Sequence, residues 1–249
     1  MVDTSAYLTE DQMISLALVA GLLLISKLRD MLDLSGLLAA MLVGLTVSIL
    51  GHWTWLVILV IFLFVGSMAT KWRFEEKRAL AIHESNEGAR GWRNVMANSA
   101  AASMVAILSW FGEGDWYYLA ATCSVSVALS DTLASEIGSL DVRTRSIITL
   151  EAVPPGTNGG MSPTGTVAAL LGALIIAGGA VLLAPVYGES MSAASFFVTV
   201  TIVGWLGCQV DSILGELLEN KGYIGKHMVN FLATLSGVAM AVIVVSRFL

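Results

Sequence analysis

Long apolar runs divide this chain into segments that are each long enough to cross a lipid bilayer. They lie at about residues 11–28, 34–51, 53–70, 94–111, 116–138, 163–184, 192–218 and 228–246. A membrane helix needs about 20 predominantly apolar residues, and backbone groups in lipid must pair within the segment. No alternating pattern of the outer-membrane barrel type is present. The sequence therefore predicts an all-α, polytopic membrane helix bundle of about eight transmembrane helices, with residues 1–249 as one domain.

Composition agrees with this class of protein. Hydrophobic residues make up 56% of the chain and charged residues only 13%, against roughly a quarter charged in soluble domains. The chain has no basic stripe of the kind that nucleic-acid binding needs, so we expect no nucleic-acid partner. Its first residues lack a positively charged segment, so we expect no cleaved signal peptide. Cys123 and Cys208 lie in apolar runs and are interpreted as packing residues.

The basic residues predict the orientation of the bundle. If there are eight spans, 12 of the 13 Lys and Arg fall in connections on one side, and Arg247 alone falls on the other. Basic connections stay in the cytoplasm, so both termini are predicted outside. The cytoplasmic side then holds a polar segment at about 71–93 and a glycine-rich loop at about 139–162. We expect a multi-pass protein of the cell membrane with its active site on the cytoplasmic side.

The glycine-rich loop is the first candidate site. Gly156, Gly159 and Gly160 can adopt positive φ, while Ser162 suits an N-cap and Pro163 the first helical position. Backbone N–H groups beside a helix N-terminus can hold a phosphate. The alternative is a plain connection between two helices. The loop carries no Walker A motif, because no Lys follows its glycines.

Four acidic residues lie near the cytoplasmic ends of the fifth and seventh spans. Asp131-Thr-Leu-Ala-Ser-Glu-Ile137 aligns with Asp211-Ser-Ile-Leu-Gly-Glu-Leu217 as a parallel internal repeat. We expect Asp131 and Asp211 to face each other and hold Mg²⁺, with Glu136 and Glu216 completing the shell or holding basic residues. An Asp and a Glu five residues apart differ by about 140° around a helix, so one pair cannot aim at one point. Helix-end ion pairs with nearby arginines, or an ion pathway, are the alternatives.

Two further groups lie at the start of spans. Arg90, Arg93 and Asn98 are at or just inside the start of the fourth span, where helix–helix hydrogen bonding is the alternative to ligand binding. Lys226, His227 and Asn230 open the eighth span, where an N-terminus with a Lys and a His can hold phosphate. Anchoring to lipid headgroups is the alternative there.

Several of these stretches together resemble one family. They are Glu87–Asn98, Ser130–Gly138, Pro154–Ser162, Gly207–Gly215 and His227–Leu232. The combination resembles the phytyl-phosphate kinase family of integral membrane proteins, from about residue 70 onward. The resemblance implies transfer of a phosphoryl group from a nucleoside triphosphate, CTP in plants, to a prenyl monophosphate such as phytyl or geranylgeranyl phosphate.

That chemistry assigns roles to the candidate residues. Metal binding falls to Asp131, Asp211, Glu136 and Glu216. Phosphate or nucleotide binding falls to Gly156, Thr157, Asn158, Gly159, Gly160, Ser162, Thr166, Arg143, Lys226, His227, Asn230 and Asn98, with Arg90 and Arg93 as further catalytic residues. The partners are the prenyl-phosphate lipid, the nucleotide with Mg²⁺, and membrane lipid, and the oligomeric state, including a homodimer, stays open. A CDP-lipid-forming cytidylyltransferase and a transporter or ion-coupled carrier are the alternative functions.

Overall fold

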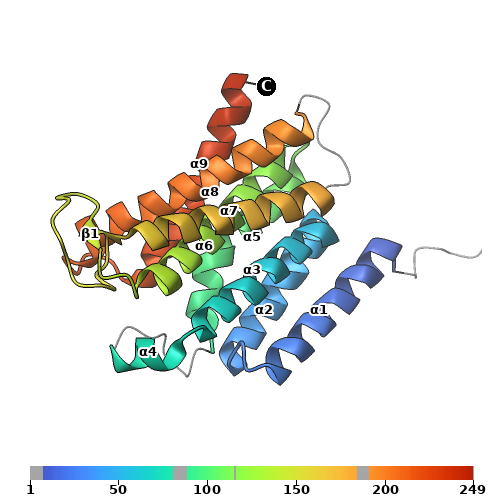
Figure 1. Ribbon diagram of the computed structural model, residues 1–249. Coiled ribbons are helices and arrows are strands. Elements are labelled where there is room, and N and C mark those ends of the chain that lie inside the picture. Colours follow the sequence, from blue (N-terminus) through green and yellow to red (C-terminus); the bar gives the residue numbers. More distant parts are fainter. Residues whose placement is uncertain (1–7, 81–88, 115, 184–190, 249) are drawn as a thin grey trace, which may run out of the picture.

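The computed structural model describes residues 8–80, 89–114, 116–183 and 191–248, and within them the chain is a bundle of long helices (Figure 1). The first half contains α1 (Glu10–Leu28), α2 (Leu34–Thr46), the π-helix η2 (Val47–Gly51), α3 (Trp53–Lys71), α4 (Phe74–Ala79) and α5 (Trp92–Phe111). The second half contains α6 (Trp116–Gly138), β1 (Arg145–Ser146), β2 (Gly160–Met161), α7 (Pro163–Leu183), α8 (Ala193–Leu214), the π-helix η4 (Gly215–Glu219) and α9 (Lys226–Phe248).

Local sequence sets where these helices begin. Thr9 forms a capping box with Gln12 at the start of α1, Asp33 caps α2, and Ser192 caps α8. Each of these side chains accepts a backbone N–H that has no partner within its helix. The predicted spans agree with the observed helices to within about two residues. Residues 184–190, between the sixth and seventh predicted spans, lie outside the described residues.

Seven helical segments of the described chain are long and apolar enough to cross a membrane. They are α1, α2 with η2, α3, α5, α7, α8 with η4, and α9. The eighth long helix, α6, has 23 residues but is rich in Ser and Thr and carries Asp131 and Glu136. Its middle is almost fully buried, because α3, α5, α7, α8 and α9 all pack against it. A helix that is shielded from lipid by its neighbours does not need an apolar surface of its own.

Glycines allow the neighbours of α6 to approach it closely. A Cβ atom added at Gly172 of α7 would lie 2.9 Å from the carbonyl oxygen of Leu129, and one at Gly207 of α8 would lie 2.2 Å from Val127. Gly237 of α9 packs in the same way against Val127 and the carbonyl of Cys123. Small residues at helix interfaces are the usual way in which membrane helices pack tightly.

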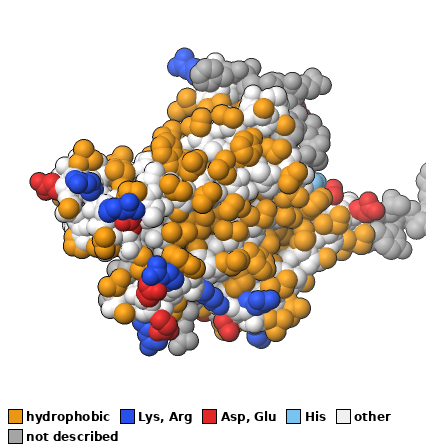
Figure 2. Space-filling view, viewed as in Figure 1, with side chains coloured by type: hydrophobic (Ala, Val, Ile, Leu, Met, Phe, Trp, Pro, Cys, Tyr) orange, Lys and Arg blue, Asp and Glu red, His pale blue; other side chains and the backbone are white. Residues whose placement is uncertain are grey.

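The two ends of the bundle differ in charge. The loop end is the end that carries α4, the segment 139–162 and the connection between η4 and α9. It holds the 12 Lys and Arg residues of the connections, whereas Arg247 lies near the other end of α9, and Figure 2 shows the charged side chains gathered at the edges of a wide apolar surface. This apolar surface is what a bundle surrounded by lipid tails presents.

Of the predicted polar segment at 71–93, α4 and the residues from Ala89 on are described. Lys77 of α4 is fully buried, and Arg73 before α4 pairs with Glu76. Residues 81–88 lie outside the described part of the chain.

Candidate functional site

The segment 139–162 is folded against the ends of α6, α7 and α8. Arg145 and Ser146 form a two-residue antiparallel ladder with Met161 and Gly160. The Ser146 hydroxyl donates to Glu216 Oε1 at 2.6 Å, which ties β1 to η4. Gly159 has φ +79°, and a Cβ atom there would lie 2.4 Å from the Cβ of Glu216. Glycine is therefore required at this position for two reasons: the turn that the sequence predicts, and the close approach of the loop to the end of α8.

The first turn of α7 is capped by the protein itself. The Ser162 hydroxyl accepts the N–H of Gly165 at 3.1 Å and donates to the carbonyl of Gly138, which confirms Ser162 as the N-cap. The Asp141 carboxylate accepts the N–H and hydroxyl of Thr164. Arg143 donates to Asp141, and these contacts together hold the pKa of the Asp141 carboxyl well below its usual range. The N–H groups of Thr164 and Gly165 are thus already paired, so the expected phosphate contact at this turn is not supported.

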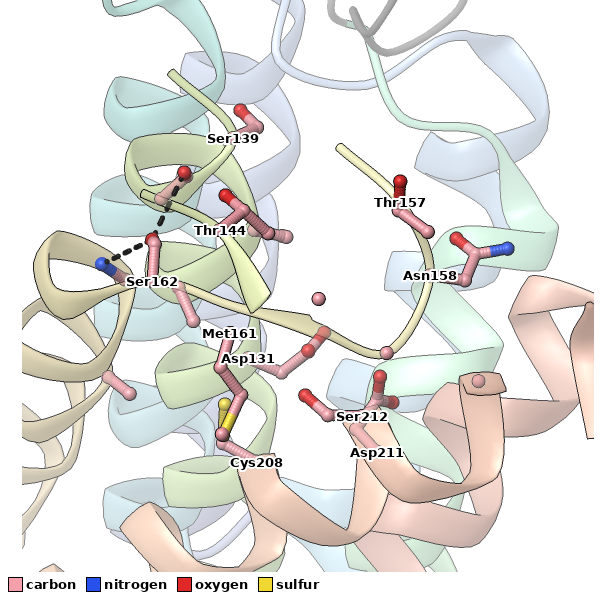
Figure 3. Close-up of a pocket in the computed structure, with 18 of the residues that line it drawn as sticks. Asp131, Ser139, Thr144, Thr157, Asn158, Met161, Ser162, Cys208, Asp211 and Ser212 are labelled. Carbon is pink, nitrogen blue, oxygen red and sulfur yellow. Dashed lines mark hydrogen bonds between the residues drawn. The ribbon is translucent and has the colours of Figure 1, made fainter. Parts of the chain in front are cut away.

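Beneath the loop lies a cavity of about 280 Å³, which Figure 3 shows from the side. It is bounded by residues of α6, the glycine-rich loop, α7, α8, η4 and α9. Its polar lining includes Asp131, Ser135, Ser139, Thr144, Thr157, Asn158, Ser162, Thr166, Gln209, Asp211, Ser212, Glu219, Lys226 and Asn230. Ala134, Ala169, Met161 and Cys208 add apolar surface, and Gly156, Gly159 and Gly160 bring loop backbone to the opposite wall.

Asp131 and Asp211 extend into this cavity from α6 and α8 (Figure 3). Their side chains lie close enough to interact with each other, and both interact electrostatically with Lys226. Asp211 Oδ2 is buried and has no hydrogen-bond partner within the described ranges. The two aspartates of the predicted repeat are therefore brought together, with a Lys beside them.

The two glutamates of the repeat lie outside the cavity, so they do not complete a metal shell there, and Glu136 instead takes the alternative role of holding a basic residue. Glu136 accepts from Lys77 Nζ at 2.6 Å, and that ammonium also donates to the carbonyls of Ala69 and Thr70 at the end of α3. Glu216 binds Ser146 in the loop. The physical reason is the spacing of five residues, which turns each glutamate away from the aspartate on its own helix.

Glu219 is an acidic residue of the cavity that sequence reasoning missed. The N–H of Asn220 donates to the carbonyl of Gly215 at 3.0 Å, which closes a π-helical turn. Such a turn holds one residue more than an α-helical turn, so Glu219 takes the position that a residue seven after Asp211 has on a regular helix. Glu219 therefore returns to the face of Asp211, and it interacts with Lys226 and Asn158. Only its position directly after the seventh predicted span could have suggested it.

The arginines assigned to catalysis or to phosphate binding do not line this cavity. Arg90 is 4% exposed, lies over the ring of Phe62 and donates to Thr70 Oγ1. It lines a separate cavity of about 40 Å³ with α1, α2, α3 and α5. Arg93 is stacked on Trp92, and Arg143 is paired with Asp141. None of the three arginines reaches the cavity, because each is held by neighbours outside it.

The remaining candidates divide between the cavity and its surroundings. Thr166 lines the cavity, but its hydroxyl donates to the carbonyl of Ser162. Asn230 lines the cavity, whereas Asn98 is buried behind it, 3.5 Å away. His227 is exposed and is not among the lining residues.

The donor set of the cavity can be compared with what Mg²⁺ requires. No group of three or more His, Cys, Asp or Glu side chains in the described ranges has the geometry to hold a metal ion. Mg²⁺ is commonly held by one or two carboxylates, with waters and substrate phosphates as the other ligands. The Asp131–Asp211 pair, with the buried and unpaired Oδ2 of Asp211, fits that requirement.

Comparison with known proteins gives the family. The chain is 30% identical to an uncharacterized membrane protein of Methanocaldococcus jannaschii, over 93% of each chain. It is 32% identical to an uncharacterized membrane protein of Synechocystis, over 76% of this chain and 73% of that one. It is 31% identical to the chloroplastic protein VTE6 of Arabidopsis thaliana, over 85% of this chain and 65% of that one.

No solved structure is significantly similar to the chain. A family model does match, and it covers residues 17–240, which include every residue that lines the cavity. The chain therefore belongs to the integral membrane protein family DUF92.

Proposed function

We propose that this protein is a membrane kinase that transfers the terminal phosphoryl group of a nucleoside triphosphate, CTP by resemblance, to a prenyl monophosphate. The observation that carries the proposal is the cavity at the loop end. It combines Asp131, Asp211, Glu219 and Lys226 with a glycine-rich backbone wall, at one end of an apolar helix bundle. The resemblance to the phytyl-phosphate kinase family and the relationship to VTE6 support the same class of reaction.

The reaction needs little covalent chemistry from the protein. An oxygen of the prenyl monophosphate forms a bond to the γ-phosphorus, the bond from that phosphorus to the β-phosphate oxygen breaks, and the nucleoside diphosphate leaves. The acceptor phosphate is already ionised near pH 7, so no general base is required. Such transfers depend mainly on positioning and on neutralising phosphate charge.

Each part of the cavity has a role in this proposal. Asp131 and Asp211 would hold Mg²⁺, which neutralises phosphate charge when bound. The backbone N–H groups of Asn158 and Gly159 have no hydrogen-bond acceptor among the described residues and would contact a phosphate of the nucleotide. Lys226 would neutralise a second phosphate, because it already lies within electrostatic reach of both aspartates. The prenyl tail would lie among the apolar helices.

The position of the site relative to the bilayer is part of the proposal. The basic connections at the loop end favour the cytoplasmic side of the cell membrane by the positive-inside rule. A cytoplasmic cavity has access to nucleotides, and the helix bundle around it lies in the bilayer that would hold the prenyl chain. A lipid kinase needs both.

Turnover by the purified full-length protein tests the proposal. The protein, in nanodiscs, is incubated with Mg²⁺, geranylgeranyl or phytyl phosphate, and γ-labelled CTP, ATP, GTP or UTP. Label in a prenyl diphosphate, with an equal amount of nucleoside diphosphate, is the expected result. Release of pyrophosphate with formation of a CDP-lipid would replace the kinase with a cytidylyltransferase. Absence of both nucleotide turnover and nucleotide binding would overturn the enzyme proposal and favour a carrier.

A further inference from the structure

Two buried asparagines connect the cavity to the helix behind it. Asn230 of α9 lines the cavity and is 8% exposed, and Asn98 of α5 is 3% exposed. Asn230 Nδ2 lies 3.5 Å from Asn98 Oδ1, and Asn98 Nδ2 donates to the backbone carbonyl of Asn94 at 2.9 Å. An amide side chain is costly to bury in an apolar bundle unless its polar atoms form hydrogen bonds or bind a ligand.

The backbone carbonyl of Asn94 fixes the orientation of both side-chain amides, that of Asn98 and that of Asn230. A carbonyl oxygen only accepts hydrogen bonds, so the NH₂ group of Asn98 must face Asn94. The oxygen of Asn98 then faces Asn230, which must present its own NH₂ group there. This leaves Asn230 Oδ1 on the other side of the amide, where it has no hydrogen-bond partner in the described part of the chain.

The packing of α9 on α6 places Asn230 at the depth of Asp131. Gly237 of α9 contacts Cys123 and Val127 of α6. The two helices run in opposite directions, so moving from Gly237 to Asn230 approaches the loop end by about the same rise as moving along α6 to Asp131. Lys226, one turn before Asn230 on the same face of α9, interacts with both aspartates.

We propose that Asn230 Oδ1 is the third protein oxygen ligand of a divalent cation held between Asp131 and Asp211, and that Asn98 is the residue that positions it. The inference deepens the proposed function, because this cation is the one that would accompany the nucleotide. Hard cations accept amide carbonyl oxygens together with carboxylates. A mixed set of two carboxylates and one amide also agrees with the absence of a three-residue His, Cys, Asp or Glu cluster in the described residues.

The role of Asn98 follows from its place behind the ligand. A residue that hydrogen-bonds a metal ligand fixes its orientation, and loss of such a residue typically weakens metal binding about 10- to 100-fold. Asn98 does not line the cavity, so substitution there leaves the cavity lining unchanged. Its effect would be transmitted through the Asn230 amide alone.

Direct titration of the full-length protein in nanodiscs with Mn²⁺, followed by electron paramagnetic resonance of the free ion, tests this assignment without nucleotide. Asn230→Leu and Asn98→Leu should each weaken Mn²⁺ binding about tenfold or more. Asn230→Asp keeps the ligand oxygen but loses the NH₂ group that faces Asn98, so it should bind Mn²⁺ more tightly than Asn230→Leu. Thr234→Val is the matched control, since Thr234 is buried at the same α5–α9 contact but does not line the cavity. Its Mn²⁺ affinity should stay within about twofold of the wild type.

Each other outcome has a definite meaning. Wild-type Mn²⁺ affinity in Asn230→Leu would overturn the assignment. A wild-type protein that binds no Mn²⁺ would overturn it too, since Lys226 alone would then neutralise the aspartates. Equal loss in Thr234→Val would show that the asparagines act through packing, which would also overturn it. Mn²⁺ binding that follows the expected pattern in a protein that turns over no nucleotide would refute the proposed kinase and leave the cation site standing.

Discussion

At the scale of single residues, the loop end contains two kinds of acidic side chain. Asp131, Asp211 and Glu219 face one cavity. Glu136 and Glu216 instead connect elements, the first to Lys77 and the second to Ser146. The same residue type therefore serves a site in one position and a structural link in another, and the deciding factor is the direction in which the helix turns each carboxylate.

The aspartate pair gives the most direct test of the site. Asp131→Asn and Asp211→Asn should each abolish nucleotide turnover, because an amide cannot supply the negative charge that a phosphate-bound cation requires. Both variants should remain folded and monodisperse, as measured by size-exclusion chromatography. A wild-type rate in either variant would remove that residue from the metal site.

The buried Lys77–Glu136 pair should matter for stability. The side chain of Lys77 is 1% exposed and that of Glu136 is 13% exposed, so loss of one partner leaves a poorly hydrated charge. Lys77→Met should destabilise the protein by on the order of 3 kcal/mol. Combining it with Glu136→Gln should cost much less than the sum of the two single changes, as a double-mutant cycle of unfolding in detergent would measure. Additive effects would mean that the pair is not coupled.

At the scale of elements, the glycine-rich loop depends on its contact with the end of α8. Gly159 and Gly222 both have positive φ, +79° and +75°, but only Gly159 has a neighbour that a Cβ would strike. Gly159→Ala should displace the loop from Glu216 and weaken nucleotide binding about tenfold or more. Gly222→Ala would introduce the same kind of backbone strain, but without a steric clash, and is therefore the control. Titration calorimetry with a non-hydrolysable nucleotide should show a loss confined to Gly159→Ala, and equal losses would assign the effect to backbone strain.

The cap of α7 predicts a specific dependence on pH. Contacts with Arg143 and Thr164 lower the pKa of Asp141, so its contribution to stability is present above the unfolded pKa of about 3.9 and is lost as the pH falls through the folded pKa. The difference in thermal midpoint between the wild type and Asp141→Ala should therefore be constant from about pH 5 to pH 8 and shrink in stronger acid. Glu151→Ala, in the same loop and exposed, is the control. A difference that grows on acidification would contradict this assignment.

At the scale of the whole molecule, the charge asymmetry of the bundle predicts its orientation. Cys123 and Cys208 are buried, so neither native thiol should react with a maleimide and background labelling should be low. A membrane-impermeant maleimide added to intact cells should label Glu113→Cys, in the connection between α5 and α6, but not Lys221→Cys, at the loop end. Both residues are exposed. Labelling of Lys221→Cys alone would invert the predicted topology.

The sequence by itself determined the class of fold and the helices. Runs of about 20 apolar residues have few alternatives to membrane helices, because each backbone N–H and C=O must be paired locally in lipid. The same reasoning predicted the N-cap at Ser162 and the meeting of Asp131 with Asp211. The N-cap depends on hydrogen bonding between residues close in the chain, and the aspartate pair depends on two equivalent helix ends. Both can be recognised in the sequence pattern.

Only the tertiary structure decided which polar residues share the cavity. The π-helical turn that brings Glu219 back to the face of Asp211 has no sequence signal that we could use. Arg90 is buried among α2, α3 and α5. Glu136 forms an ion pair with Lys77, which lies 59 positions away in the chain. Such pairings depend on how helices distant in the chain pack, and a buried charge pairs with whichever partner that packing places within reach.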